Sequence, residues 1–218
     1  MFTEKTRLSI QEKNMSRIDD SKAETRRLIL NAAHILFWKK GADKCTIRDI
    51  SEEAGVSPAS VIVHFKNKTA LLEAALYQEI EKALGKALAT LPGKANLQAT
   101  LIHLLAFMLT FYDNNRELYR ILVRDTFFEP IHNSPSMGKL DKQYLTFIIS
   151  LIDQEKEQGG IREEVNASLL ASSFFHLYLG VLRDFLRDPE LTVTTAVDQL
   201  SVTLELYFTG IAQTGEKQ

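Results

Sequence analysis

The residues that could do chemistry gather in one short segment, 52–68, with the sequence EEAGVSPASVIVHFKNK. Its hydroxyl, imidazole and ammonium groups, at Ser57, Ser60, His64 and Lys68, are types that bind phosphate oxygens. Its middle contains no Arg, Lys, Asn or Gln, which supply the strongest hydrogen bonds to the edges of bases. The segment therefore suits contact with a polyanion, and it poses the question of how a sequence of bases would be recognised.

Motifs for catalysis and for metal binding are missing from the sequence. The five histidines show no HExxH or paired spacing, and a single cysteine, Cys45, cannot build a thiolate zinc site or an internal disulfide. No GxSxG, P-loop or GxGxxG motif is present. We therefore expect no enzyme, no metal and no cofactor. The single cysteine and the polar start of the chain favour a cytoplasmic protein without a signal peptide.

Charged residues are distributed unevenly along the chain. The net charge is −2, yet residues 21–68 carry nine Lys and Arg against five Asp and Glu, whereas residues 69–218 carry thirteen against nineteen. A basic head on an acidic body indicates that only the head meets a polyanion. Two uncharged segments, 95–112 and 165–182, approach the length of a membrane span, but their Asn, Ser and His side chains favour buried helices of a soluble protein.

The head is expected to follow a flexible arm formed by residues 1–20, which lack apolar periodicity and contain Met15 as an alternative translation start. The segment SKAE, beginning at Ser21, has the pattern of a capping box and predicts the start of a first helix. Gly41, which adopts positive φ easily, predicts its end. Apolar residues at helical spacing predict its buried face: Leu28, Ala32, Ile35 and Leu36.

Two short helices are predicted to follow, joined by a turn that contains glycine. Thr46 and Asp49 repeat the capping pattern at the start of the second helix, which ends at Gly55. Ser57 is a good N-cap for the third helix, and Pro58 suits its first position, where a missing N–H costs nothing. Such a pair of helices is a helix-turn-helix.

The rest of the chain, residues 69–218, is predicted to form a helical body. A fourth helix begins in KNKTALLEAAL and continues to a break at 91–96. Five more helices are expected at about 97–112, 115–124, 136–158, 167–187 and 194–212. The predicted fold class is therefore all-α, with a three-helix head at 21–68 and a six-helix body.

The segment TIRDISEEAGVSPASVIVHFKNKTALL, residues 46–72, resembles the DNA-binding head of the tetracycline-repressor (TetR) family. The resemblance implies a homodimeric transcription regulator, usually a repressor, whose third helices enter the major groove of a pseudo-palindromic operator. It also implies a small-molecule effector that binds the body and changes the distance between the two heads. Carried over position by position, it implies DNA contacts from Thr46, Arg48, Ser57, Pro58, Ala59, Ser60, Ile62, Val63, His64 and Lys68.

The sequence departs from the family pattern at Ile62, where Tyr is common. Within 58–63 only Ser60 has a side chain that forms hydrogen bonds, while Arg48 can either reach a guanine or pair with Glu52. We therefore expect an operator recognised through thymine methyl groups and DNA shape as well as hydrogen bonds. The alternative is a protein derived from a helix-turn-helix that binds a partner or sequesters a ligand without sequence-specific DNA binding.

The aromatic residues of the body predict a mostly apolar effector pocket with a few polar groups that orient the ligand. Such a pocket suits a lipophilic compound, a fatty acyl chain or an aromatic drug better than a sugar. The residues expected to line it are His103, Phe107, Phe111, Tyr119, Arg120, Phe147, Phe174 and Tyr178. The dimer contact is expected at Phe175, Leu179, Leu182, Leu204 and Phe208.

Overall fold

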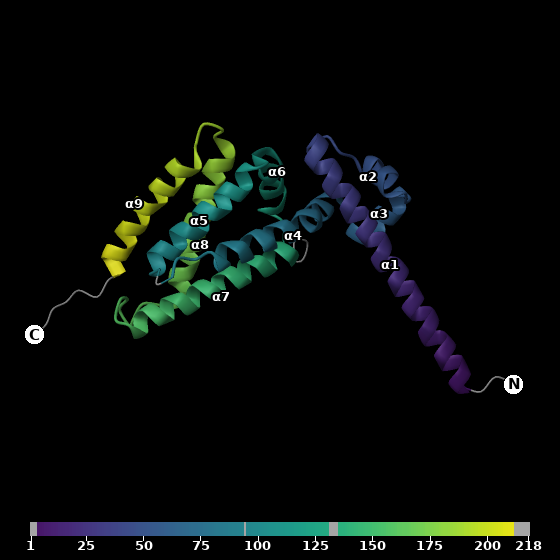
Figure 1. Cartoon of the computed structure of the whole chain (residues 1–218), viewed down its shortest axis with the longest axis horizontal. Helices are drawn as coiled ribbons and strands as arrows, with labels where there is room; N and C mark the ends of the chain where they lie inside the picture. Colours follow the sequence, from purple (N-terminus) through teal and green to yellow (C-terminus); the bar gives the residue numbers. More distant parts are fainter. Residues whose placement is uncertain (1–3, 94, 131–134, 212–218) are drawn as a thin grey trace, which may run out of the picture. The chain divides into compact units, whose positions relative to one another are not determined.

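The computed structural model describes residues 4–93, 95–130 and 135–211, and these residues form nine helices and no β-strand (Figure 1). The chain divides into two compact units, which we call the head (Met1–Leu76) and the body (Tyr77–Gln218). The all-α fold predicted from the sequence is confirmed. The division between the units follows Leu76, however, rather than residue 68.

The head consists of three helices and the beginning of a fourth. Helix α1 is Glu4–Lys40, α2 is Ile47–Ala54, α3 is Pro58–Phe65, and α4, Lys68–Ala89, continues into the body. Helices of eight residues are not stable alone, so α2 and α3 depend on a core that they share with α1 and α4. The core side chains are exposed by 6% or less and include Ile29, Leu36, Phe37, Ile50, Val61, Phe65 and Leu72.

Helix α1 begins earlier than the sequence predicted. Residues 4–20 are helical, so the prediction of a flexible arm is wrong for them, while residues 1–3 lie outside the described part of the chain. The stretch contains neither Gly nor Pro and is rich in helix formers such as Glu, Lys, Arg and Gln. Ser21 therefore lies inside the helix, where its carbonyl oxygen accepts a hydrogen bond from Thr25 Oγ1 at 2.9 Å.

The buried face of α1 was predicted correctly at Ala32 and Leu36, which are buried, but not at the other two predicted positions. Leu28 and Ile35 are 38% and 39% exposed, whereas Ile29 and Phe37 are fully buried. Both sets recur at helical spacing, so the sequence pattern alone does not choose between them. The choice is made by packing against α2 and α3, which lie against α1 in the head.

The body is built from the remainder of α4 and five more helices. These are α5 (Leu97–Asp113), α6 (Arg116–Thr126), α7 (Pro135–Glu157), α8 (Ala167–Arg187) and α9 (Val193–Ile211). Helix α5 packs against α9, and α7 packs against α8. All five begin and end within two residues of the predicted bounds, and residue 212 lies outside the described residues.

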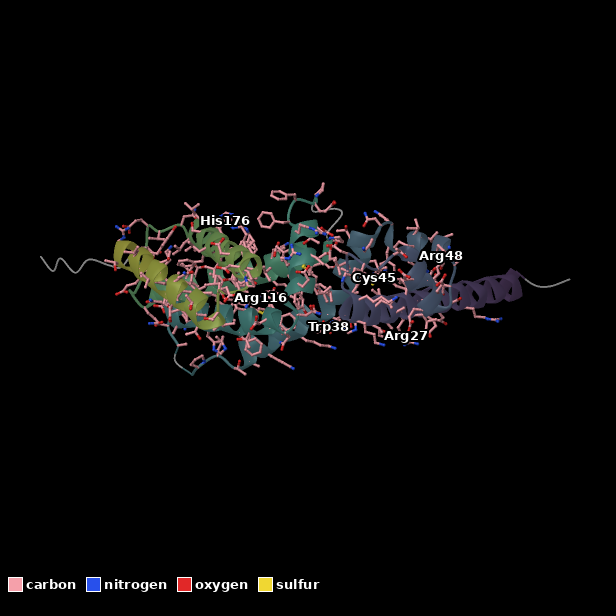
Figure 2. All side chains as sticks on the ribbon, turned by 90° about the horizontal axis from the view of Figure 1, so that it is seen from above. Arg27, Trp38, Cys45, Arg48, Arg116 and His176 are labelled. Atoms are coloured by element: carbon pink, nitrogen blue, oxygen red, sulfur yellow. The ribbon has the colours of Figure 1, made fainter. Side chains whose placement is uncertain are left out.

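Arg116, marked in Figure 2, fastens the end of α8 to the start of α6. Its Nε and Nη2 atoms donate to Asp113 at 3.0 and 2.6 Å, and its Nη1 atom lies 3.0 and 3.2 Å from the carbonyl oxygens of Asp188 and Leu191. The guanidinium also lies over the ring of Phe185, 3.9 Å from its centroid. Its Nη1 atom also lies 3.4 Å from the carbonyl oxygen of Phe185 in the last turn of α8, one of the carbonyl groups that a helix end leaves without a helical partner.

We expect Arg116→Lys to lower the free energy of unfolding by about 2 kcal/mol, because an ammonium group cannot replace the planar fork of donors. Urea unfolding followed by circular dichroism measures this loss. Arg183→Ala is the matched control on α8, since its pair with Asp184 is exposed and should contribute less than about 1 kcal/mol. Equal losses in the two variants would contradict the role given to Arg116.

Candidate DNA-binding surface and effector cavity

The helix-turn-helix is delimited by an N-cap before each of its two helices and by one glycine in the turn between them. Thr46 Oγ1 accepts from the backbone N–H of Asp49 at 3.1 Å, and a carboxylate oxygen of Asp49 accepts from the backbone N–H of Thr46 at 2.8 Å. Gly55 ends α2 with φ of 68°, in the left-handed region. Ser57 Oγ then accepts from the backbone N–H of Ser60 at 3.1 Å and begins α3. The predicted caps are confirmed.

The two caps leave their hydroxyl groups in different states. Thr46 Oγ1 also donates to Asp49 at 2.7 Å, so its proton is already used within the capping box. Ser57 uses its oxygen only as an acceptor in the cap, which leaves its proton available for a phosphate oxygen. A phosphate at the start of α2 would therefore meet the backbone amides of Ile47 and Arg48 before it met the Thr46 hydroxyl.

Helix α3 buries one face and exposes the other. Val61 and Phe65 lie in the head core, whereas Ile62 and Val63 are 45% and 81% exposed. Pro58 and Ala59 are exposed as well, and Ser60 and His64 are half-buried. The side chains proposed to meet DNA from α3 thus share an accessible surface that is mainly apolar.

Arg48 and Lys68 are the two cations of the head that are proposed to meet DNA, and each contacts another group of the head. Arg48, marked in Figure 2, is 82% exposed and donates to Glu52 at 3.0 Å. Such exposed pairs are worth less than about 1 kcal/mol, so the guanidinium remains available for another partner. Lys68 Nζ lies 3.5 Å from the carbonyl oxygen of Asp43 in the loop before α2.

Arg26 is a positioning residue that the sequence analysis missed. Its Nη1 atom donates to the carbonyl oxygen of His64 at 3.3 Å, and its guanidinium lies 4.2 Å from the centroid of the Phe65 ring. These contacts fix the end of α3 against α1. No local pattern could have identified Arg26, because its partners lie far along the chain.

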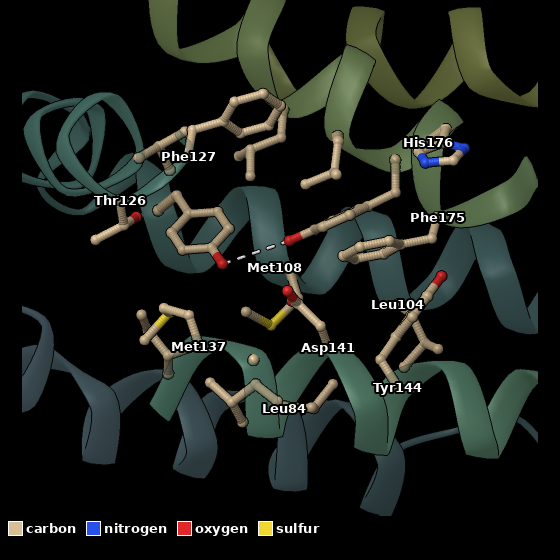
Figure 3. Close-up of a pocket in the computed structure, with 18 of the residues that line it drawn as sticks. Leu84, Leu104, Met108, Thr126, Phe127, Met137, Asp141, Tyr144, Phe175 and His176 are labelled. Carbon is tan, nitrogen blue, oxygen red and sulfur yellow. Dashed lines mark hydrogen bonds between the residues drawn. The ribbon is translucent and has the colours of Figure 1, made fainter. Parts of the chain in front are cut away.

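A cavity of about 400 Å³ lies within the body (Figure 3). It is bounded by α4, α5, α6, α7 and α8, and its walls are mostly apolar. This volume is within the range of small-molecule sites in proteins. The apolar lining includes Leu84, Leu104, Met108, Val123, Phe127, Met137, Phe175, Leu179 and Leu182.

A few polar groups reach this cavity. Tyr112 and Tyr178 join their hydroxyl groups at 3.4 Å, the contact drawn as a dashed line in Figure 3. Burial raises the pKa of Tyr112 to about 12 and the pKa of Tyr144 and Tyr178 above the ordinary value, so all three phenols are neutral at physiological pH. Burial also raises the pKa of the Asp141 carboxyl to about 6.

Of the eight residues expected to line the effector pocket, Tyr178 lines this cavity and the other seven do not, so their contact with an effector stays a prediction. Phe111 and Tyr119 instead pack together in the core, with ring centroids 5.0 Å apart, and His103 contacts the carbonyl oxygen of Ala87 at 3.0 Å. Helix α5 is apolar nearly all round, so periodicity does not tell which of its faces borders a cavity. The seven residues are His103, Phe107, Phe111, Tyr119, Arg120, Phe147 and Phe174.

The predicted dimer residues are also occupied within the chain. Phe175, Leu179 and Leu182 line the cavity, Leu204 is buried, and Phe208 stacks on Phe174. The apolar side chains that α8 and α9 do expose are different ones: Leu169, Val202, Leu206 and Tyr207.

Helix α8 is long and apolar enough to span a membrane by length and composition alone, which is weak evidence for a span. A third of its most apolar stretch is buried within the chain.

Within the described residues, no three His, Cys, Asp or Glu side chains come together in a group that could hold a metal ion. His132 lies outside the described residues.

Two short capped helices, a glycine turn and an accessible outer face on the second helix define a DNA-binding protein of the helix-turn-helix class.

Comparison with known proteins identifies the family. The model described as "Bacterial regulatory proteins, tetR family" matches residues 29–75, which include the whole helix-turn-helix. The head therefore carries the DNA-binding domain of the TetR family, and the chain is a DNA-binding transcriptional regulator. Among its curated relatives, the HTH-type transcriptional regulator UidR of Escherichia coli K12 is 26% identical over 166 residues, which cover 73% of this chain and 81% of UidR.

Other similarities concern a part of the chain or the fold alone. The HTH-type transcriptional regulator TtgR of Pseudomonas putida is 40% identical over 60 residues, which cover 28% of this chain and 29% of TtgR. The crystal structure of Thermus thermophilus FadR, a TetR family repressor in complex with lauroyl-CoA, has a TM-score of 0.71 at 17% identity and covers 88% of this chain and 99% of FadR.

We expect Gly55→Ala to lower the free energy of unfolding by about 1 kcal/mol, because its φ of 68° strains any residue with a Cβ. The cost is one of backbone conformation, since a Cβ built at Gly55 meets nothing within 4 Å. Gly85→Ala in α4 is the control with the opposite sign, a gain of about 0.5–1 kcal/mol from helix propensity. Thermal unfolding measures both, and a stabilising Gly55→Ala would contradict the turn.

Proposed function

We propose that this regulator is an effector-released repressor that binds a pseudo-palindromic operator as a homodimer. The observation that supports it most is that one chain combines an accessible outer face on α3 with a cavity of about 400 Å³ inside the body. A regulator of this kind acts where the chromosome is, so we place it in the cytoplasm. Its relatives are named as transcriptional regulators, and we propose no catalytic activity.

On the DNA side, α3 would read thymine methyl groups with its exposed apolar atoms. Val63, at 81% exposure, is the residue best placed for such a contact, and Ser60 can bond to a base or a phosphate in either direction. Arg48 would exchange its exposed partner Glu52 for a guanine or a phosphate. The full set of proposed DNA contacts is Thr46, Arg48, Ser57, Pro58, Ala59, Ser60, Ile62, Val63, His64 and Lys68.

The dimer contact we propose differs from that expected from the sequence. The start of α8 and the second half of α9 expose Leu169, Val202, Leu206 and Tyr207 by 38–72%. Exposed apolar side chains of this size, gathered on two helices, mark an interaction surface. A second copy that covers them through a twofold axis would give two heads for two half-sites of an operator.

Release would follow from linkage between the cavity and the head. A ligand shifts an equilibrium only by the ratio of its affinities for the two conformations, so the effector must prefer a body conformation that holds the heads at the wrong separation. Solved FadR proteins of this fold carry lauroyl-CoA and stearoyl-CoA, which supports the body as the ligand-binding part. At 17% identity these structures do not assign their ligand to this chain.

The experiment that tests the proposal is selection from a random duplex DNA library with the full-length protein at near-physiological salt. We expect a twofold symmetric motif rich in T, with affinity that falls steeply as salt rises because phosphate contacts release counterions. Recovery of the library without enrichment, from a folded dimer, would instead favour a partner-binding protein that uses the apolar surface of Ile62 and Val63.

The selected operator then tests how α3 reads it. Replacing the contacted thymine by deoxyuridine, which lacks the methyl group, should weaken binding by about fourfold, the value of one buried methylene-sized group. Val63→Ser should bind both duplexes equally, whereas Arg48→Ala should keep the methyl effect. Fluorescence anisotropy measures the six affinities of the unchanged protein and the two variants for the two duplexes, and a methyl effect that survives in Val63→Ser would contradict the assignment.

A further inference from the structure

Asp141 is the charged group of the cavity that the rest of the structure does not use. It projects from α7 into the cavity beside Tyr144, below Phe175 (Figure 3). Within the described part of the chain, no hydrogen bond or ion pair to its carboxylate is present. Solvent reaches the side chain, which is exposed, although apolar groups surround it. A carboxylate held in this way has the chemistry of a site for a positive charge.

Aromatic rings from two helices stand around the same part of the cavity. Tyr144 of α7 stacks with Tyr178 of α8, with centroids 6.0 Å apart, and Phe175 lies 5.5 Å from Tyr144 and 6.2 Å from Tyr178. The faces of such rings attract cations, most strongly where water is excluded. Burial keeps the phenols neutral, so the rings add no second negative charge.

The rest of the lining argues against an anionic ligand. Among the described residues that line the cavity, none is Lys or Arg, and the titratable side chains besides Asp141 and the three tyrosines are Glu129 and His176. A fatty acid or a phosphorylated ligand placed here would meet carboxylates rather than a cation. The burial of an uncompensated charge is costly in an apolar site.

We propose that the effector is a lipophilic cation, a protonated amine or quaternary ammonium on an apolar body, whose charge lies against Asp141 and the ring faces of Tyr144, Phe175 and Tyr178. The inference rests on the proposed function of the body as the effector-binding part. It narrows that function to one class of ligand. The apolar remainder of the molecule would fill the space beside Leu104, Met108 and Leu179.

The charge on Asp141 sets the expected pH dependence. The ionised carboxylate binds a cation and the protonated one does not, so affinity for a permanent cation should be full above the pKa of about 6 and be lost as pH falls through it. Tyr112, Tyr144, Tyr178, Glu129 and His176 are the other titratable groups of the lining. Asp141→Asn separates the contribution of Asp141 from theirs.

The test uses three probes with the same dodecyl chain and different head groups: dodecyltrimethylammonium, dodecanol and dodecanoate, all below their aggregation concentrations. Calorimetric titration of the full-length protein at neutral pH should give the ammonium probe an affinity about tenfold above that of dodecanol, with dodecanoate weakest. Asp141→Asn should abolish this preference, whereas Asp153→Asn, an exposed carboxylate elsewhere on α7, should keep it. Tightest binding of dodecanoate, or a preference unchanged in Asp141→Asn, would overturn the proposal.

The rings are tested by a second pair of variants. Tyr144→Phe keeps the ring face and should keep the preference for the ammonium probe, whereas Tyr144→Leu removes the face and should reduce it severalfold while dodecanol binding changes less. Equal losses for the two probes in Tyr144→Leu would show an ordinary apolar contact and overturn the part given to the rings.

A measurement without ligand distinguishes a functional carboxylate from an incidental one. The folded-state pKa of Asp141 lies above its ordinary value of 3.8, so the charge is less favourable in the folded protein than in the unfolded one, and stability is lost as pH rises from about 4 to about 6. Asp141→Asn should therefore raise the melting temperature at neutral pH and change it little at a pH near 4. A lower melting temperature at neutral pH would mean that Asp141 serves the fold.

Failure of this inference and failure of the proposed function give different results. Anisotropy of the selected operator, measured with each probe, reports release independently of binding. If dodecanoate both binds best and releases the operator, the cation site is wrong and effector release stands. If the ammonium probe binds through Asp141 and the operator stays bound, the cation site stands and release by this cavity is wrong.

Discussion

The head depends on one constraint: α2 and α3, of eight residues each, cannot form unless they bury a shared apolar face. Val61 and Phe65 meet that requirement together with Ile50 of α2, and all three are exposed by 4% or less. Burial of one face of a helix leaves the opposite face at the surface, so this packing directs Ile62 and Val63 outward. Stability and the proposed DNA contact thus depend on opposite faces of the same two turns.

The helices of the body also depend on burying apolar side chains, and a single helix there contributes to several environments. Helix α8 places Phe174 and Phe185 in the core, turns Phe175 and Tyr178 toward the cavity, and exposes Leu169. One apolar helix therefore serves a core, a ligand site and the proposed partner surface. Since all three environments favour apolar residues, substitutions along α8 that alter the cavity are expected to disturb its neighbours as well.

The sequence predicted what local interactions decide and failed where tertiary packing decides. Helix caps and tight turns depend on interactions within about four residues. The caps at Thr46 and Ser57 and the turn at Gly55 lie where the sequence predicted them. The face of α1 was misassigned because Leu28 and Ile29 belong to equally periodic sets. The lining of the cavity was not predicted because Phe111 and Tyr112 both lie on an all-apolar helix, and only the packing of α5 against its neighbours turns Tyr112 rather than Phe111 toward the cavity. Which face of a helix is buried and which lines a cavity depends on distances between segments, and a single sequence does not contain those distances.

Asp141 shows how such a site can be recognised once the structure is known. Selection for stability alone would favour a neutral side chain there, because the groups around Asp141 desolvate its carboxylate and make ionisation costly even though solvent reaches it. A cation beside the carboxylate offsets the free-energy cost of its ionisation, and the same cation lowers the pKa of the carboxyl toward its ordinary value. The ionised Asp141 thus lowers stability without the ligand and raises it with the ligand, which gives a difference in free energy between the free and the bound protein. That difference is what a ligand needs in order to shift an equilibrium between conformations.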